Sequence, residues 1–381
     1  MKNRIYPQGI IQEDVFTLAS TGARVGKSYS SLIAPKTITQ SRKDIKDWTQ
    51  AQNMTKLEEN PKWWMLEQLK DNIFLDAHLK SQYKNRILSA LSVKAELKKP
   101  NGEVDKEQTA LINDSVWAKK INKHILDSIY RGFSLIELSL NAEKELQVTL
   151  IPRENLNPRD GYLYPDYMDD KKIQYRKAAE YGKWILEFND NDDDGLFNSA
   201  IPHVLMKRFA QSCFSELAEI YGIPPRSLKT NTQDPVMMAR ATKMMKEMAA
   251  AAYVIIDESE TLEWAKGAVT SGDVYTNLID VCKSEISLLF QGAVIGQDTK
   301  HGNRSKEESS QNLLNELIDN DLDVRATYWN TIVIPALVQI GIIKGEVTYG
   351  YEQSENLKQL WDMTKDVLQY KNVDDEWIKE K

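Results

Sequence analysis

The stretch from Phe197 to Leu314 constrains the fold most, because helical patterns and turn signals alternate along it in a fixed order. Apolar spacing over 197–221 predicts a helix, which Gly222 and the following Pro224-Pro225 pair end. A strand at 226–229, an Ala/Met-rich helix at 234–252 and strands at 253–257 and 261–264 come next. A second long helix over 273–291 then leads to a polar glycine-rich loop. The sequence therefore predicts two long helices that flank a compact α/β unit.

The first half of the chain has a mixed pattern. Residues 1–40 have little periodicity and predict an extended arm that becomes ordered only on a partner, and a first helix follows at 41–52. A second helix is expected after Asn60-Pro61, with an apolar stripe that continues towards Tyr83. Alternating apolar residues over 88–97 predict a strand, and a helix opened by Asp105 and Gln108 is expected to run to Tyr130. Gly132 ends that helix.

Four further strands are predicted, at 133–140, 146–151, 173–176 and 183–188. An acidic stretch at 189–195 ends this region, which makes 61–195 an α+β domain. Beyond the polar loop, Ser305 and Glu308 form a capping box for a last long helix, which Pro335 is expected to kink or end. The overall fold class is α+β.

Composition excludes some classes of protein. The net charge of −7 argues against a dedicated nucleic-acid reader, whose surface would be strongly basic. The chain contains no run of about 18 apolar residues, so a membrane span is not expected, and no signal-peptide pattern is visible. Cys213 and Cys282 lie in apolar helical patterns and are expected to be buried free thiols in a reducing cytoplasm.

Two motifs resemble chemical sites without meeting their requirements. Gly22 to Ser28 resembles a phosphate-binding loop, but three residues separate its glycines where four are needed. Asp190 to Gly195 resembles the start of a calcium loop, but Ile201 occupies the position that needs a glutamate, so a solvated acidic linker is the better interpretation and a weak calcium site the other. The four histidines have no metal-ligand spacing. We expect no catalytic site, metal or cofactor.

Two groups of residues are candidates for binding. The loop between the long helices carries Lys300, Arg304 and Lys306 against Asp298, a formal charge of +2, and the candidate contacts to DNA are Lys300, His301, Asn303, Arg304 and Lys306. The Ala/Met-rich helix places several small or flexible side chains on one face, which predicts either an ordinary core face or an interface with another subunit. These residues are Met237, Ala241, Met244, Met245 and Met248.

The landmarks Glu219-Ile-Tyr-Gly-Ile-Pro-Pro-Arg226, Tyr253-Val-Ile-Ile-Asp257 and Ile295-Gly-Gln-Asp-Thr299 follow one another without a catalytic cluster. In this the chain resembles the Mu-like family of tailed-bacteriophage portal proteins, over roughly residues 60–370. The resemblance implies an N-terminal arm and first helix at 1–60, a wing at 61–195, and paired stem helices at 196–222 and 271–292. It further implies a clip at 223–270, a channel loop at 293–305, a long kinked helix at 306–345 and an acidic helical segment at 346–381.

The resemblance also implies a function. Portal proteins form a homo-oligomeric ring, usually of about twelve subunits, at one capsid vertex, through which DNA enters and leaves. The implied partners are further copies of the chain, the terminase large subunit, the major capsid protein, head-completion or adaptor proteins and double-stranded DNA bound non-specifically. The implied location is the virion, and the host cytoplasm during assembly. Two alternatives are a non-portal capsid adaptor or scaffold protein and an ATP-dependent enzyme that uses the segment at Gly22.

Overall fold

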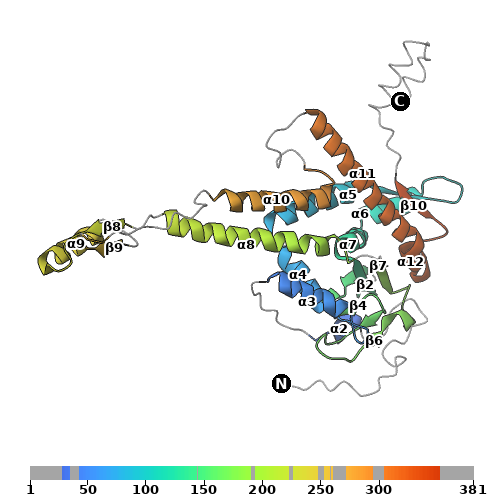
Figure 1. Cartoon of the computed structure of the whole chain (residues 1–381). Coiled ribbons are helices and arrows are strands. Elements are labelled where there is room, and N and C mark those ends of the chain that lie inside the picture. Colours follow the sequence, from blue (N-terminus) through green and yellow to red (C-terminus); the bar gives the residue numbers. More distant parts are fainter. Residues whose placement is uncertain are drawn as a thin grey trace, which may run out of the picture.

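The computed structural model describes residues 28–34, 43–143, 145–189, 194–222, 226–247, 253–257, 259–260, 272–294 and 304–351. A mixed helical and β body gives rise to a long pair of helices, which extends away from it and carries a small α/β unit at its far end (Figure 1). We call the helix pair the stem and the small unit the clip. The mixture of helices and small sheets agrees with the α+β class predicted from the sequence.

The N-terminal part of the body is helical. It contains α2 (Tyr29–Leu32), α3 (Ile45–Thr55), α4 (Trp64–Ile73) and α5 (Ala77–Ser92). The side chain of Asp44 accepts hydrogen bonds from the backbone of Lys46 and Asp47 and so begins α3. Asp76 caps α5 in the same way, which divides the single helix predicted after Pro61 into two.

Two expectations for this part are wrong. The chain over 88–92 continues α5 as helix, and only β1 (Ala95–Lys98) is a strand, because Ile87 and Ala90 are buried at helical spacing while Leu88 is exposed. Residues 28–34 are not an unanchored arm either. Tyr29 is fully buried in the core, and its backbone N–H donates to the buried carboxylate of Glu137 at 2.9 Å.

Three antiparallel strands form the largest sheet. The central strand β2 (Phe133–Leu140) pairs with β3 (Leu146–Leu150) on one side and β7 (Ile185–Asn189) on the other. In front of it in sequence lie α6 (Lys106–Asp114) and α7 (Val116–Arg131), which Ser115 separates where one helix was predicted. Gly132 ends α7 at a φ of 90°, a value that L side chains rarely adopt, as the sequence predicted.

Short elements connect β3 to β7. They are η1 (Arg153–Asn155), β4 (Leu156–Asn157), β5 (Tyr162–Leu163), β6 (Ile173–Gln174) and η2 (Tyr175–Lys177), and the three strands form a small antiparallel sheet in the order β4-β5-β6. The strand predicted over 173–176 is therefore only two residues long.

The stem consists of α8 (Leu196–Gly222), which leads outward, and α10 (Asp273–Gln291), which returns. Between them the clip contains β8 (Arg226–Lys229), α9 (Pro235–Glu247) and β9 (Tyr253–Ile256), with the two strands paired in parallel. These elements confirm the predicted order of helix, strand, helix, strand and helix. The strand predicted at 261–264 lies outside the described residues.

The C-terminal part returns to the body. A long helix α11 (Arg304–Tyr328) continues through a π-helical turn, η4 (Trp329–Val333), into α12 (Ile334–Ile340). The hydrogen bonding departs from the α-helical pattern just before Pro335, which has no N–H to donate, but the chain stays helical to Ile340, so Pro335 does not end the helix as the sequence allowed. The chain then forms β10 (Thr348–Tyr351), which pairs antiparallel with β1 and was not predicted. Residues 352–381, the larger part of the predicted acidic helix, lie outside the described residues.

Two apolar clusters hold the body together. One joins α4, α5 and α7 to the first turns of α8 and the last turns of α10, including Phe197, Val204, Ile286 and Phe290. The other lies between the three-stranded sheet, α7, η4 and α12 and surrounds the buried Trp184 and Trp329. The base of the stem is therefore part of the body's core. Cys282 is buried as predicted, Cys213 is half-buried, and both are free thiols.

Candidate functional site

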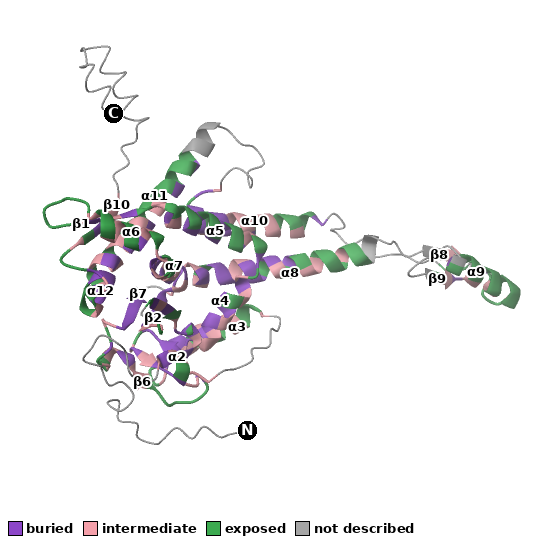
Figure 2. Cartoon of the chain, turned by 180° about the vertical axis from the view of Figure 1, so that it is seen from behind, coloured by how far each residue is buried: buried purple, intermediate pink, exposed green. Residues whose placement is uncertain are grey.

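The stem changes from buried to exposed along its length. At the base of α8, Phe197, Ala200 and Ile201 are fully buried or nearly so, whereas the outer half of the helix is mainly exposed (Figure 2). The two helices pack along each other, and the rings of Phe214 and Tyr275 lie 6.5 Å apart near the outer end. The stem is thus a two-helix projection with a fixed base.

A glycine allows this close packing at the start of α10. Gly272 has a φ of +68°, and a Cβ at this position would lie 2.7 Å from the ring of Phe214. A larger residue would force the Phe214 ring to move and would strain the backbone, so both the conformation and the space favour glycine at position 272.

Polar contacts from the N-cap residue and the first turn of α5 hold the base of both stem helices. The carboxylate of Asp76 accepts a hydrogen bond from the buried Lys207 ammonium of α8 at 2.6 Å. The Nε2 atom of His78 lies 3.1 Å from the carbonyl oxygen of Lys283 and 3.1 Å from the hydroxyl of Ser287, both on α10. Because Asp76 and His78 together contact both helices, they fix the direction in which the stem leaves the body.

The stem exposes large apolar side chains on both of its helices. Phe209 of α8 and Val281 of α10 are each 56% exposed, and Met206, Val274 and Leu288 are also exposed. Scattered exposed apolar residues are ordinary on a monomer, but a series along a narrow projection is typical of a surface that another protein covers.

The clip is small and has little core of its own. Ala241 and Met245 of α9 are buried in the described chain, whereas Met237 and Met244 are exposed, and Met248 lies outside the described residues. The face predicted from the sequence is therefore divided into a buried and an exposed half. Hydrogen bonds from Ser259 and from Thr232 hold the pKa of Asp257 below its usual value and fix the end of β9. The role of these methionines at an interface stays a prediction.

The candidate DNA loop falls largely outside the described residues. Lys300, His301 and Asn303 lie there entirely, and Arg304 and Lys306 begin α11 with side chains that are not described. The predicted capping box at Ser305 is misplaced, because α11 begins at Arg304, two residues before the predicted first helical residue, and Ser305 lies inside the helix. The neighbouring elements are described: α10 ends at Gln291 and is capped by Gly292, whose φ is 71°, and α11 begins at Arg304. Contact of this loop with DNA remains a prediction.

The two motifs that resemble chemical sites lie largely outside the described residues. Residues 22–27 and 190–193 are not among them, and the hydroxyl of Ser28 donates to Glu137. Within the ranges described, no group of three or more His, Cys, Asp or Glu side chains is placed to hold a metal ion. No helix there has the length and apolar character needed to cross a membrane.

Sequence reasoning missed the buried polar residues that connect distant parts of the chain. Arg325 of α11 donates to the carbonyl oxygens of Ala90 and Val93 and to the hydroxyl of Tyr351. Glu67 is buried between Lys70 and Arg131. In the sequence, such a residue can be recognised only as a charged side chain that falls on the apolar face of a predicted helix.

The described chain thus consists of a mixed helical and β body, a two-helix stem, a clip at the end of the stem and a long helix with a π-helical turn. The chain matches the sequence profile of the family described as portal protein of Mu bacteriophage over residues 67–381. It therefore belongs to this family of phage portal proteins, whose members are structural components of the virion. A comparison with curated proteins finds no match to the chain.

Proposed function

We propose that the chain assembles into a closed ring of about twelve copies at one capsid vertex and that double-stranded DNA passes through the ring during packaging and ejection. The observation that carries this proposal is the series of exposed apolar side chains on both stem helices, with Phe209 on α8 and Val281 on α10. Apolar area of this kind is stabilised when a second protein surface removes it from water.

A ring follows if each stem contacts its neighbour through two different faces. Such a contact repeats around an axis until it closes, and it then leaves no unpaired face. The clip supports the same arrangement. A described sheet of only two strands is marginal alone, and β8 and β9 each have an edge without a strand partner among the described residues. A strand or helix of the next copy would complete it.

The proposed channel would use charge without sequence recognition. One loop of charge +2 per subunit, with Lys300 and Arg304, repeats around the ring as a basic collar. Contacts to phosphate groups carry no sequence information, which suits a channel for a whole genome. The net charge of −7 over the whole chain limits tight binding of DNA elsewhere.

The proposed partners follow from the position of each part in such a ring. The clip, at the free end of the stem, would contact the terminase large subunit during packaging and head-completion or adaptor proteins afterwards. The body would contact the major capsid protein. The described chain supports this only through the exposure of the clip and its distance from the body along the stem (Figure 1).

Substitution of one exposed stem residue tests ring formation. Val281→Lys places a charge on the proposed contact without disturbing the core, so the chain should remain folded but fail to form rings. Val116→Lys is the matched control, because Val116 is 69% exposed on α7 in the body. Rings from both variants, observed by electron microscopy, would contradict the proposed contact. A defined complex that is not a ring would favour a capsid adaptor or scaffold.

A further inference from the structure

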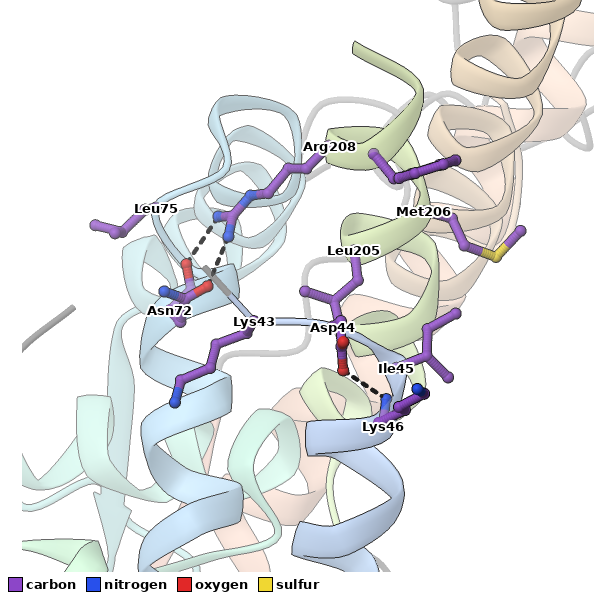
Figure 3. Close-up of a pocket in the computed structure, with 10 residues that line it drawn as sticks. Lys43, Asp44, Ile45, Lys46, Asn72, Leu75, Leu205, Met206 and Arg208 are labelled. Carbon is purple, nitrogen blue, oxygen red and sulfur yellow. Dashed lines mark hydrogen bonds between the residues drawn. The ribbon is translucent and has the colours of Figure 1, made fainter. Parts of the chain in front are cut away.

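A groove lies at the base of the stem on the side of α3 and α4. It has a volume of about 590 Å³ and is bordered by the start of α3, the end of α4 and one side of α8. Figure 3 shows the side chains that line it. Arg208 donates a hydrogen bond to Asn72 at one edge, and the Asp44 carboxylate accepts one from the backbone N–H of Lys46 at another. Arg208 donates hydrogen bonds to the side-chain amide oxygen of Asn72 at 2.6 Å and to its backbone carbonyl oxygen at 2.8 Å, which joins α8 to the end of α4 at this edge.

The groove combines an apolar floor with a basic rim. Leu75 and Phe209, each 56% exposed, and the less exposed Met206 and Leu205 supply the apolar surface. The rim carries three basic side chains, Lys43, Lys46 and Arg208, and one acidic side chain, Asp44. Its formal charge is therefore +2. An occupant with an apolar stripe and acidic flanks fits this surface best.

The C-terminal part of the same sequence has this character. Leu357, Leu360, Trp361 and Leu368 recur at positions i, i+3, i+4 and i+11, a spacing that predicts one apolar face of a helix. Residues 352–381 contain eight acidic side chains and five lysines, which gives a formal charge of −3. A short amphipathic helix in an apolar groove is a common way for proteins to bind one another.

The position of the last described strand favours a groove on another copy. β10 ends at Tyr351 beside β1, whereas the groove lies with α3 and α4 on the other side of α8 (Figures 1 and 2). Only five residues separate Tyr351 from Leu357, and even a fully extended link of that size spans only about 17 Å.

We propose that the groove between α3, α4 and α8 binds residues 357–368 of a neighbouring copy of the chain. This contact rests on the proposed ring. It would cover Met206 and Phe209 of α8, and the separate stem contact would then be made by exposed side chains of α10 such as Val274 and Val281.

Disulfide trapping in the full-length chain tests the contact. Met206→Cys and Leu360→Cys are introduced together into a Cys213→Ser, Cys282→Ala background, and ring formation is checked by native mass spectrometry. After mild oxidation, we expect a ladder of covalent oligomers on a denaturing gel, up to the size of the ring. Leu88→Cys with Leu360→Cys is the control and should give no ladder, because Leu88 is 60% exposed but lies on α5, outside the groove.

The charge contribution is tested in the same assay. Lys43→Glu with Lys46→Glu should slow formation of the ladder severalfold at low salt and less at high salt, because salt screens exposed charges. Adding Asp362→Lys and Asp366→Lys should restore the rate.

The outcomes separate this contact from the ring itself. Intact rings with oxidised monomers alone would place the segment on its own chain, and intact rings with free thiols would assign the groove to another occupant. Either result overturns this inference and leaves the proposed function standing. If the unmodified chain forms no rings, both fail.

Discussion

Arg86 of α5 and Asp321 of α11 form a buried ion pair in which the Arg86 Nε and Nη2 atoms each donate to one carboxylate oxygen at 2.7 Å. Arg86 also donates to the carbonyl oxygen of Phe290 at the end of α10 at 3.1 Å. A single guanidinium therefore joins α5, the stem and the long helix, on the two sides of the candidate DNA loop.

Removal of one partner of this pair should be far more costly than removal of both. Asp321→Leu leaves the Arg86 charge buried without its carboxylate, and we expect a loss of about 3–5 kcal/mol in the free energy of unfolding. Arg86→Met with Asp321→Leu should recover most of this loss. Chemical denaturation of the three proteins measures the difference, and a double variant as unstable as the single one would contradict the account.

The clip offers two adjacent methionines with opposite expectations. Met245 is buried in the described chain, so Met245→Asp should disrupt packing of α9 at a cost of several kcal/mol. Met244 is exposed, so Met244→Asp should leave the clip folded and instead weaken ring formation or binding of terminase. Protection of α9 from hydrogen exchange, measured beside ring yield, distinguishes the two. Equal effects of both changes would show that the division of the helix face has no functional meaning.

The candidate DNA loop is tested by charge reversal. Lys300→Glu with Arg304→Glu changes two charges from +1 to −1, a change of −4 per subunit. The collar should then repel phosphate groups, while exposed loop substitutions usually change stability by less than about 0.5 kcal/mol. We expect normal rings and procapsids with a reduced yield of packaged genome. Equal decreases in ring yield and genome yield would instead assign the loop a structural role.

His124 of α7 makes stability depend on pH. Burial lowers the pKa of His124 to about 4, although the nearby Asp127 acts in the opposite direction. The unfolded chain therefore binds a proton at a higher pH than the folded chain, so the contribution of His124 is complete above about pH 6.5 and is lost as the pH falls towards 4. Thermal unfolding of the body between pH 7 and pH 4.5 should show this loss, and His124→Gln should reduce the slope. An unchanged slope would exclude His124 as its source.

The sequence predicted the elements whose local signals agree with one another. In the clip and stem, Gly222, Pro224 and Gly272 separate clear apolar periods, and the structure places the elements at nearly the predicted boundaries. At 88–92 the prediction was wrong, because leucines and alanines alternated as in a strand while Ile87 and Ala90 also fitted a helix. Burial of Ile87 and Ala90 in the core stabilises the helix over the strand, and a single sequence does not show which residues are buried.

Contacts between distant parts of the chain were beyond sequence reasoning. The pairing of Ala95 with Tyr351 joins two segments with no shared local signal. Likewise, Arg86 and Asp321 each resemble ordinary surface charges within helical patterns. Their burial is explained only by the ion pair that they form between α5 and α11. The candidate interfaces depended on the family resemblance for the same reason, since an exposed methionine has no sequence mark that distinguishes it from a buried one.

The central claim is that this chain closes into a ring, and native mass spectrometry of the purified full-length protein over a range of concentrations tests it most directly. The account predicts one dominant closed assembly of about twelve copies, which Val281→Lys reduces to monomers and Val116→Lys leaves unchanged. Only monomers or twofold dimers at every concentration, for the unmodified chain, would contradict it.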